Sequence, residues 1–238
     1  MSTSGRLQYL DWLRGLAVVL MMETHVFDSF LAERFRTSEW YWLSQFLGGM
    51  PAPLFLFLLG VSLALVLERL HEKKAPAPVI LDKVLRRAGW ILFLAYAFRL
   101  EQAAEWFPYT DWKEILKVDI LNCLALSSLA VGLLGVRRLK RRWNAALMGV
   151  CAVLVVVVTP WIFLIRDTAV PAVLEYLNGR GHPNYFMFFS WGAFAFAGAA
   201  TGYLLIDARA KGREEQFMSG AGIAGIGAYA LGDRKSVV

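Results

Sequence analysis

Two ionisable side chains, Arg14 and His25, stand eleven positions apart within a long apolar stretch at 10–31. Eleven residues of α-helix make three turns plus about 20°, so both side chains fall on one face, roughly 16 Å apart along the axis. An ionisable residue at the centre of a membrane span costs roughly 2.5 to 3.5 kcal/mol, and such residues are usually functional. The spacing therefore predicts a cation near one end of a helix and a proton acceptor near the other.

The roles of these residues follow from their chemistry. Arg14 is suited to hold a phosphate or a carboxylate, and His25 is suited to take up and return a proton near neutral pH. Asp28, one turn after His25, is placed to orient the imidazole. The plainer interpretations are that Arg14 pairs with Asp11 and extends to the membrane interface, that His25 is satisfied between helices, and that Asp28 is a solvated residue.

A second polar group lies near the ends of two later apolar segments. Asp119 and Asn122 are three residues apart and share a helical face. Together with Arg99 and Glu101 they predict a polar mouth for a substrate, to which Asp11 is added as a further substrate-binding candidate. An ordinary polar fringe at the depth of the lipid headgroups explains the same residues.

Basic residues in the connections give a third candidate. Arg86 and Arg87, with Lys83 beside them, are suited to bind the phosphates of a nucleotide-bearing cofactor, although the usual charge bias of membrane proteins also explains them. His182 precedes the last long apolar segment and is expected at the surface or, less favoured, at the substrate. His71 lies in a charged connection and is expected at the surface. The sequence has no metal-ligand spacing, so no metal site is predicted.

The elements that must position these residues are membrane helices. The chain is 58% hydrophobic and only 18% charged, whereas a soluble domain has about 25% charged residues. The mean hydropathy is +0.49. Apolar residues come in blocks of about twenty without strand-like alternation, which predicts an all-α, polytopic transmembrane bundle in the lipid bilayer. We expect six spans, at 10–31, 44–67, 84–100, 118–136, 143–165 and 186–206, and the start of a seventh at 217–231.

The distribution of Lys and Arg predicts the orientation of these spans. The N-terminus and the connections around 69–87, 137–142 and 209–213 carry about twice as many basic residues as the opposite connections. We therefore expect a cytoplasmic N-terminus in a bacterial inner (plasma) membrane. Arg14 then lies near the cytoplasmic end of its helix, and His25 lies nearer the outer end. The net charge of +6 reflects these short connections and does not indicate a nucleic-acid partner.

Several motifs resemble those of one enzyme family. The segment RLQYLDWLRGLA at 6–17, followed by His25, resembles the opening helix of the type-3 membrane acyltransferases and of the related heparan-alpha-glucosaminide N-acetyltransferase-like group. PLFLFLLG at 53–60 is similar to the second helix of the family, and VDILNCLALS at 118–127 is similar to a later segment. A weaker similarity covers 182–198.

This resemblance implies an acyltransferase that takes an acyl group, usually acetyl, from cytoplasmic acetyl-CoA. The group passes to a hydroxyl or amine of a sugar or glycan on the extracytoplasmic side. His25 carries over as the base or transient acyl acceptor, and Arg14 as the donor-side or structural partner. Asn122 stands where relatives often have Gln or His. The family usually has about ten helices, so we expect 1–232 to be the N-terminal part of the domain.

The last six residues, 233–238, read DRKSVV, which one frame of a widely used sequencing adapter encodes. We therefore expect them to be a non-native tail. Two other classes of function stay open. Polar residues at membrane depth together with helices broken by Pro and Gly also suit a transporter or flippase for a glycan or small solute. A non-catalytic membrane scaffold is the remaining alternative.

Overall fold

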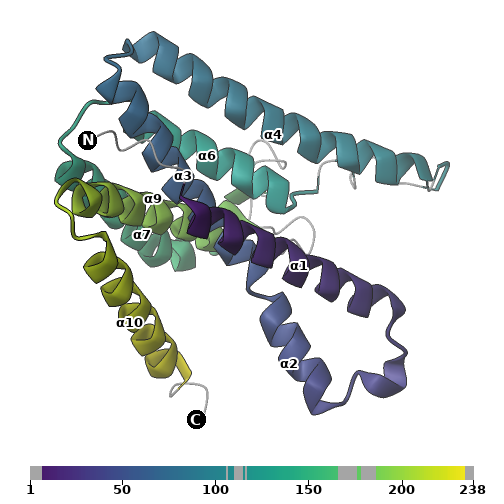
Figure 1. Ribbon diagram of the computed structural model, residues 1–238. Coiled ribbons are helices and arrows are strands. Elements are labelled where there is room, and N and C mark those ends of the chain that lie inside the picture. Colours follow the sequence, from purple (N-terminus) through teal and green to yellow (C-terminus); the bar gives the residue numbers. More distant parts are fainter. Residues whose placement is uncertain are drawn as a thin grey trace.

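The computed structural model describes residues 7–105, 107–109, 115, 117–165, 176–177 and 186–233. All regular secondary structure within these ranges is helical, which confirms the predicted fold class (Figure 1). The elements are α1 (Gln8–Phe30), the short 3-10 helix η1 (Glu33–Phe35), α2 (Glu39–Gly48), α3 (Pro51–Glu72), α4 (Ala77–Glu105), α6 (Ile120–Gly135), α7 (Arg141–Ile162), α9 (Phe188–Ala210) and α10 (Glu214–Asp233).

Within the described residues, three helical segments are long and apolar enough to cross a membrane. They are Glu39–Glu72, Arg141–Ile162 and Phe188–Ala210, while α6 is a shorter apolar helix. This supports an integral membrane protein, but the count of six spans is not confirmed. The reason lies in composition, because α1 and α4 are long enough to cross yet interrupt their apolar residues with several charged ones.

The second predicted span, 44–67, is two helices rather than one. α2 ends at Gly48, the chain bends through Gly49 and Met50, and α3 begins at Pro51. Proline is favoured in the first turn of a helix, where its missing N–H has no intrahelical partner and its ring sets φ. Pro51 therefore begins α3, at the bend within the apolar segment Glu39–Glu72.

The bundle core lies among α3, α6, α7 and α9. α3 and α9 approach so closely that a Cβ added at Gly60 would overlap the backbone of Ala195, and one at Gly198 would overlap the backbone of Phe57. Gly202 likewise faces Val61. The small residues at 198–202 therefore serve helix packing, because only glycine lets two helix backbones come this near.

Against this core, α1 lies on α3, α4 lies beside α6, and α10 follows α9 (Figure 1). One end of the bundle collects the first residues of α1, α4, α7 and α10 and the last residues of α3, α6 and α9, and we call it the charged end. His71, in the last turn of α3, was expected at the surface, and that expectation is wrong. Its side chain is only 6% exposed and its Nε2 lies 3.2 Å from the carbonyl oxygen of Val136, because α3 packs there against the end of α6.

Candidate functional site

A cavity of about 270 Å³ lies at the charged end, between the first turns of α1 and the last turns of α3. Apolar side chains form part of its wall, and three charged groups and one hydroxyl supply its chemistry. Its lining consists of Leu7, Leu10, Asp11, Arg14, Ser62, Leu65, Val66 and Arg69. The cavity therefore contains the arginine that the sequence singled out.

Arg14 is held from two helices. Its Nη1 donates to Asp11 Oδ1 at 2.8 Å within α1, and its Nη2 donates to the hydroxyl of Ser62 in α3. Ser62 in turn donates to the carbonyl oxygen of Leu58 at 2.5 Å. The expected pair with Asp11 exists, and the contact from α3 fixes the guanidinium at the cavity wall as well.

Positive charge exceeds negative charge around this cavity. Arg69 lines it, and Arg87 of α4 lies close enough to Arg14 for the two charges to repel each other. Within the described residues, Asp11 is the one carboxylate that lines the cavity. Arginine cannot lose its proton to relieve such repulsion, so an anion would stabilise the group.

The two arginines predicted to bind a cofactor are placed differently. Arg87 is partly buried and faces Arg14, whereas Arg86 is exposed. Arg86 Nε donates to both carboxylate oxygens of Asp82, one turn earlier, at 2.8 and 2.9 Å. Arg86 is thus part of a surface pair on α4, and its role in cofactor binding stays a prediction. Arg69, which the sequence analysis did not select, lines the cavity. Its position on α3, seven residues after Ser62, was the signal that it shares a face with that serine.

His25 lies on the same continuous helix as Arg14, so the register deduced from the spacing holds. Its side chain is exposed and forms no hydrogen bond or ion pair among the described residues. The residue before it, Thr24, packs against Gly48 of α2. Asp28 accepts a hydrogen bond from Gln45 Nε2 at 3.0 Å, so a role for Asp28 in orienting the imidazole stays a prediction.

A polar network joins the last turns of α4 to the start of α6. These ends of the two helices lie away from the cavity. Arg99 Nη2 pairs with Asp119 Oδ2 at 3.0 Å, and the arginine side chain is 17% exposed. Asp119 and Asn122 form a capping box at the start of α6, in which Asn122 Oδ1 accepts from the Asp119 backbone N–H at 3.1 Å. The structure thus brings together Arg99, Asp119 and Asn122 of the predicted substrate-binding residues, while Asp11 belongs to the cavity at the charged end.

Two tyrosines that sequence reasoning missed complete the network. The buried Asn122 donates through Nδ2 to the hydroxyl of Tyr176 at 2.9 Å, and that hydroxyl lies 2.5 Å from the hydroxyl of Tyr96. Tyr96 precedes Arg99 by three residues on one helical face, which was an available signal. The sequence offered no such signal for Tyr176, because the residues it contacts are far from it in the sequence. His182 lies outside the described residues.

The described residues therefore define an all-helical integral membrane protein with an arginine-lined cavity at one end and a hydrogen-bonding network nearer the other. A comparison with protein-family models matches residues 6–232 to the catalytic region of heparan-alpha-glucosaminide N-acetyltransferase. The match covers almost the whole sequence, and the chain belongs to this family. Comparisons with curated proteins and with solved structures gave no match. Membership makes the chain an acetyltransferase-type membrane protein, in a family that generally uses acetyl-CoA as donor.

Proposed function

We propose that this protein transfers an acetyl group from cytoplasmic acetyl-CoA to a hydroxyl or amine of a sugar or glycan on the extracytoplasmic side of a bacterial inner membrane. The observation that carries the proposal is the cationic cavity around Arg14, on the same helical face as His25. The N-terminus, and with it the charged end, would then be cytoplasmic.

The cavity fits the phosphate part of the donor. Arg14 and Arg69 line the cavity and Arg87 lies near Arg14, whereas Asp11 is the one described carboxylate in the lining, so positive charge is in excess. Coenzyme A carries a diphosphate linkage and a 3′-phosphate, so its negative charge is opposite in sign to that of the cavity. Arg14 and Arg69 would hold the oxygens by charge-assisted hydrogen bonds. The volume suits a diphosphate and leaves the remainder of the donor to extend along α1.

Bound acetyl-CoA would supply an acetyl group activated as a thioester. His25, further along α1, would remove the proton from the acceptor hydroxyl or amine, or accept the acetyl group transiently. General-base assistance of this kind contributes roughly 10²- to 10⁴-fold to a rate. The exposed position of His25 leaves its imidazole accessible to an acceptor.

The network at the other end of α4 and α6 supplies groups that suit a sugar. Tyr96 and Tyr176 carry hydroxyl groups, which the amide of the buried Asn122 holds in place through Tyr176, and the Arg99–Asp119 pair joins the same helix ends. Sugar hydroxyls both donate and accept hydrogen bonds, and these side chains do the same. We therefore assign the acceptor to this network.

The test is transfer of radiolabelled acetyl by the full-length protein in sealed liposomes. Labelled acetyl-CoA on one side and amino sugars or oligosaccharides on the other should give labelled acceptor in the acceptor compartment. His25→Ala should reduce the rate at least about a hundredfold, in line with loss of a general base. Movement of unmodified sugar, without covalent transfer, would identify a transporter. Full activity of the His25→Ala variant would refute the proposed mechanism.

A further inference from the structure

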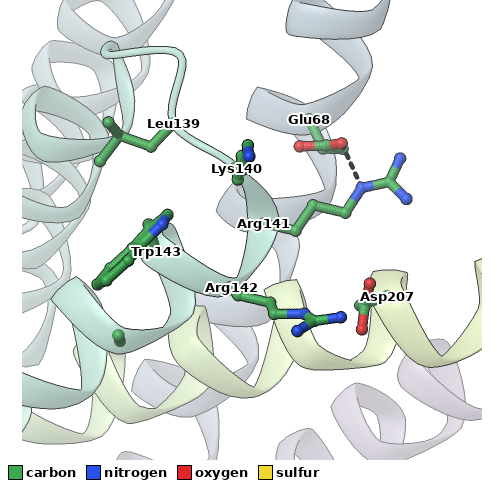
Figure 2. Close-up of a pocket in the computed structure, with 8 residues that line it drawn as sticks. Glu68, Leu139, Lys140, Arg141, Arg142, Trp143 and Asp207 are labelled. Atoms are coloured by element: carbon green, nitrogen blue, oxygen red, sulfur yellow. Dashed lines mark hydrogen bonds and ion pairs between the residues drawn. The ribbon is translucent and has the colours of Figure 1, made fainter.

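A second and larger cavity lies at the charged end, and it shares no lining residue with the cavity around Arg14. It encloses about 860 Å³ between the last turns of α3, the first turns of α7 and the end of α9 (Figure 2). Its lining consists of Glu68, Leu139, Lys140, Arg141, Arg142, Trp143, Ala146 and Asp207. The acetyl-transfer proposal uses none of these residues.

Each carboxylate around this cavity lies within ion-pair distance of a cation, and Glu68 and Glu72 share Arg141. Arg141 Nε pairs with Glu68 Oε1 at 2.6 Å, and Arg141 Nη2 pairs with Glu72 Oε1 at 3.0 Å. Asp207 forms an ion pair with Lys211, one turn later on α9. The two pairs of Arg141 connect α3 to α7. Each described carboxylate of the group therefore has a cation as its partner.

Lys140 and Arg142 are the two other cations that line this cavity. Within the described part of the chain, neither Lys140 nor Arg142 forms a side-chain hydrogen bond or an ion pair, although the Arg142 guanidinium points across the cavity toward Asp207 (Figure 2). Four cations, counting Lys211, therefore face three carboxylates, which leaves an excess of one positive charge. The uncapped first turn of α7 adds the positive end of a helix dipole.

The cavity continues directly into an apolar surface. Trp143 at its edge is 67% exposed, and Val150, Val153 and Val157 follow it on one side of α7 with 49 to 61% of each side chain exposed. Spacings of three and four residues place these side chains in one stripe along the helix. α7 is among the helices able to cross a membrane, so this stripe is suited to lie against acyl chains.

We propose that this cavity binds the headgroup of an anionic phospholipid. The phosphodiester, with one negative charge, matches the excess of one positive charge and is held by Lys140 and Arg142. The acyl chains lie along the Trp143–Val157 stripe of α7. A free phosphate shares the charge chemistry but has no use for the apolar stripe, which favours the lipid. This inference does not depend on the acetyl-transfer proposal.

The experiment titrates the purified full-length protein in detergent with phosphatidylglycerol and counts bound lipid by native mass spectrometry. Lys140→Gln/Arg142→Gln should weaken binding about tenfold or more, because each basic residue near a lipid surface contributes substantially. The matched control is Arg137→Gln/Arg138→Gln, which removes the same charge from the same connection but outside the cavity lining. This control should stay within about twofold of the wild type.

Two further measurements distinguish binding of an anionic phospholipid from binding of free phosphate. Trp143→Ser should weaken phosphatidylglycerol binding, and zwitterionic phosphatidylcholine should bind weakly to every variant. An equal loss in both double variants would overturn the proposal, because binding would then follow overall charge. Binding of inorganic phosphate that depends on Lys140 and Arg142, with no retained phosphatidylglycerol, would overturn the lipid assignment. Thermal unfolding of each variant confirms that it is folded.

Discussion

Arg14 of α1 and Ser62 of α3, 48 positions apart in sequence, are joined by a hydrogen bond at the wall of the cationic cavity. The serine is the contact by which α3 fixes a guanidinium that belongs to α1. The uncharged Ser62 thus helps to position the charged side chain of Arg14.

Ser62→Ala tests this relationship. The variant keeps the Arg14–Asp11 pair but lets the guanidinium move, so we expect the KM for acetyl-CoA to rise a few-fold, by about 1 kcal/mol of lost hydrogen bonding, with kcat little changed. Steady-state kinetics in liposomes measures both. Thr201→Ala is the matched control, because Thr201 makes the same kind of bond to a carbonyl one turn earlier, but on α9. An equal rise in KM for both variants would exclude a specific role for Ser62.

The neighbouring arginines of α4 provide a second comparison. Arg87 faces Arg14, while Arg86 pairs with Asp82 at the surface. Arg87→Gln should raise the KM for acetyl-CoA about tenfold, since a partly buried positive charge near the bound phosphates is lost, and Arg86→Gln should change it less than about twofold. Direct binding of coenzyme A, followed by calorimetry, reports the same difference without turnover. The reverse order of effects would place the donor elsewhere.

At the other end of the bundle, Tyr176→Phe removes the hydroxyl that joins Asn122 to Tyr96. If the network receives the acceptor, the KM for the sugar should rise about fivefold to tenfold, as expected for one or two lost hydrogen bonds. The KM for acetyl-CoA should not change. A change confined to the donor KM would contradict the assignment of the acceptor to this network.

Contact between α3 and α9 has a consequence for stability. Gly60→Ala would drive a methyl group into the backbone of Ala195, and overpacking of this kind typically costs about 1 to 3 kcal/mol. The thermal unfolding midpoint in detergent should therefore fall by several degrees. Gly149→Ala in α7 is the control, since an added Cβ there meets nothing within 4 Å. Alanine also favours a helix over glycine, so this variant should be at least as stable as the wild type.

The start of α1 is tied to α10 by a hydrogen bond of 3.0 Å from the Tyr9 hydroxyl to Glu214, which also pairs with Arg209. Burial, and then the hydrogen bond to Glu214, raise the pKa of Tyr9 to about 12, from 10.0. Between pH 10 and 12 the unfolded chain loses the phenolic proton before the folded one does, so stability falls as pH rises through this window. The stabilisation is complete below pH 10.

The unfolding midpoint, measured from pH 9 to pH 12 for wild type and Tyr9→Phe, checks this effect. Phenylalanine has no proton to lose, so the variant should show a flatter decline across the window. Parallel curves for the two proteins would show that Tyr9 does not contribute to the pH dependence of stability.

The helical class and the face shared by Arg14 and His25 could be predicted, because both follow from local periodicity along one helix. Asp119 and Asn122 were foreseeable as a pair for the same reason. The contribution of Ser62, the burial of His71 and the hydrogen bonds of Tyr176 depend on how distant helices pack, and local spacing carries no information about that. The count of six spans is not confirmed where charged residues interrupt α1 and α4, since hydropathy alone cannot place such helices.

The backbone contact at Gly60 and Gly198 joins α3 closely to α9, and both helices have many buried residues. A displacement of one helix against the other would therefore disrupt much of the core. α1, by contrast, buries only Leu10 and Ala17 among its described residues. Arg14 travels with α1, whereas Arg69 stays with α3. The contact between α1 and α3 is therefore the place where entry of a large donor requires the least disruption of the fold.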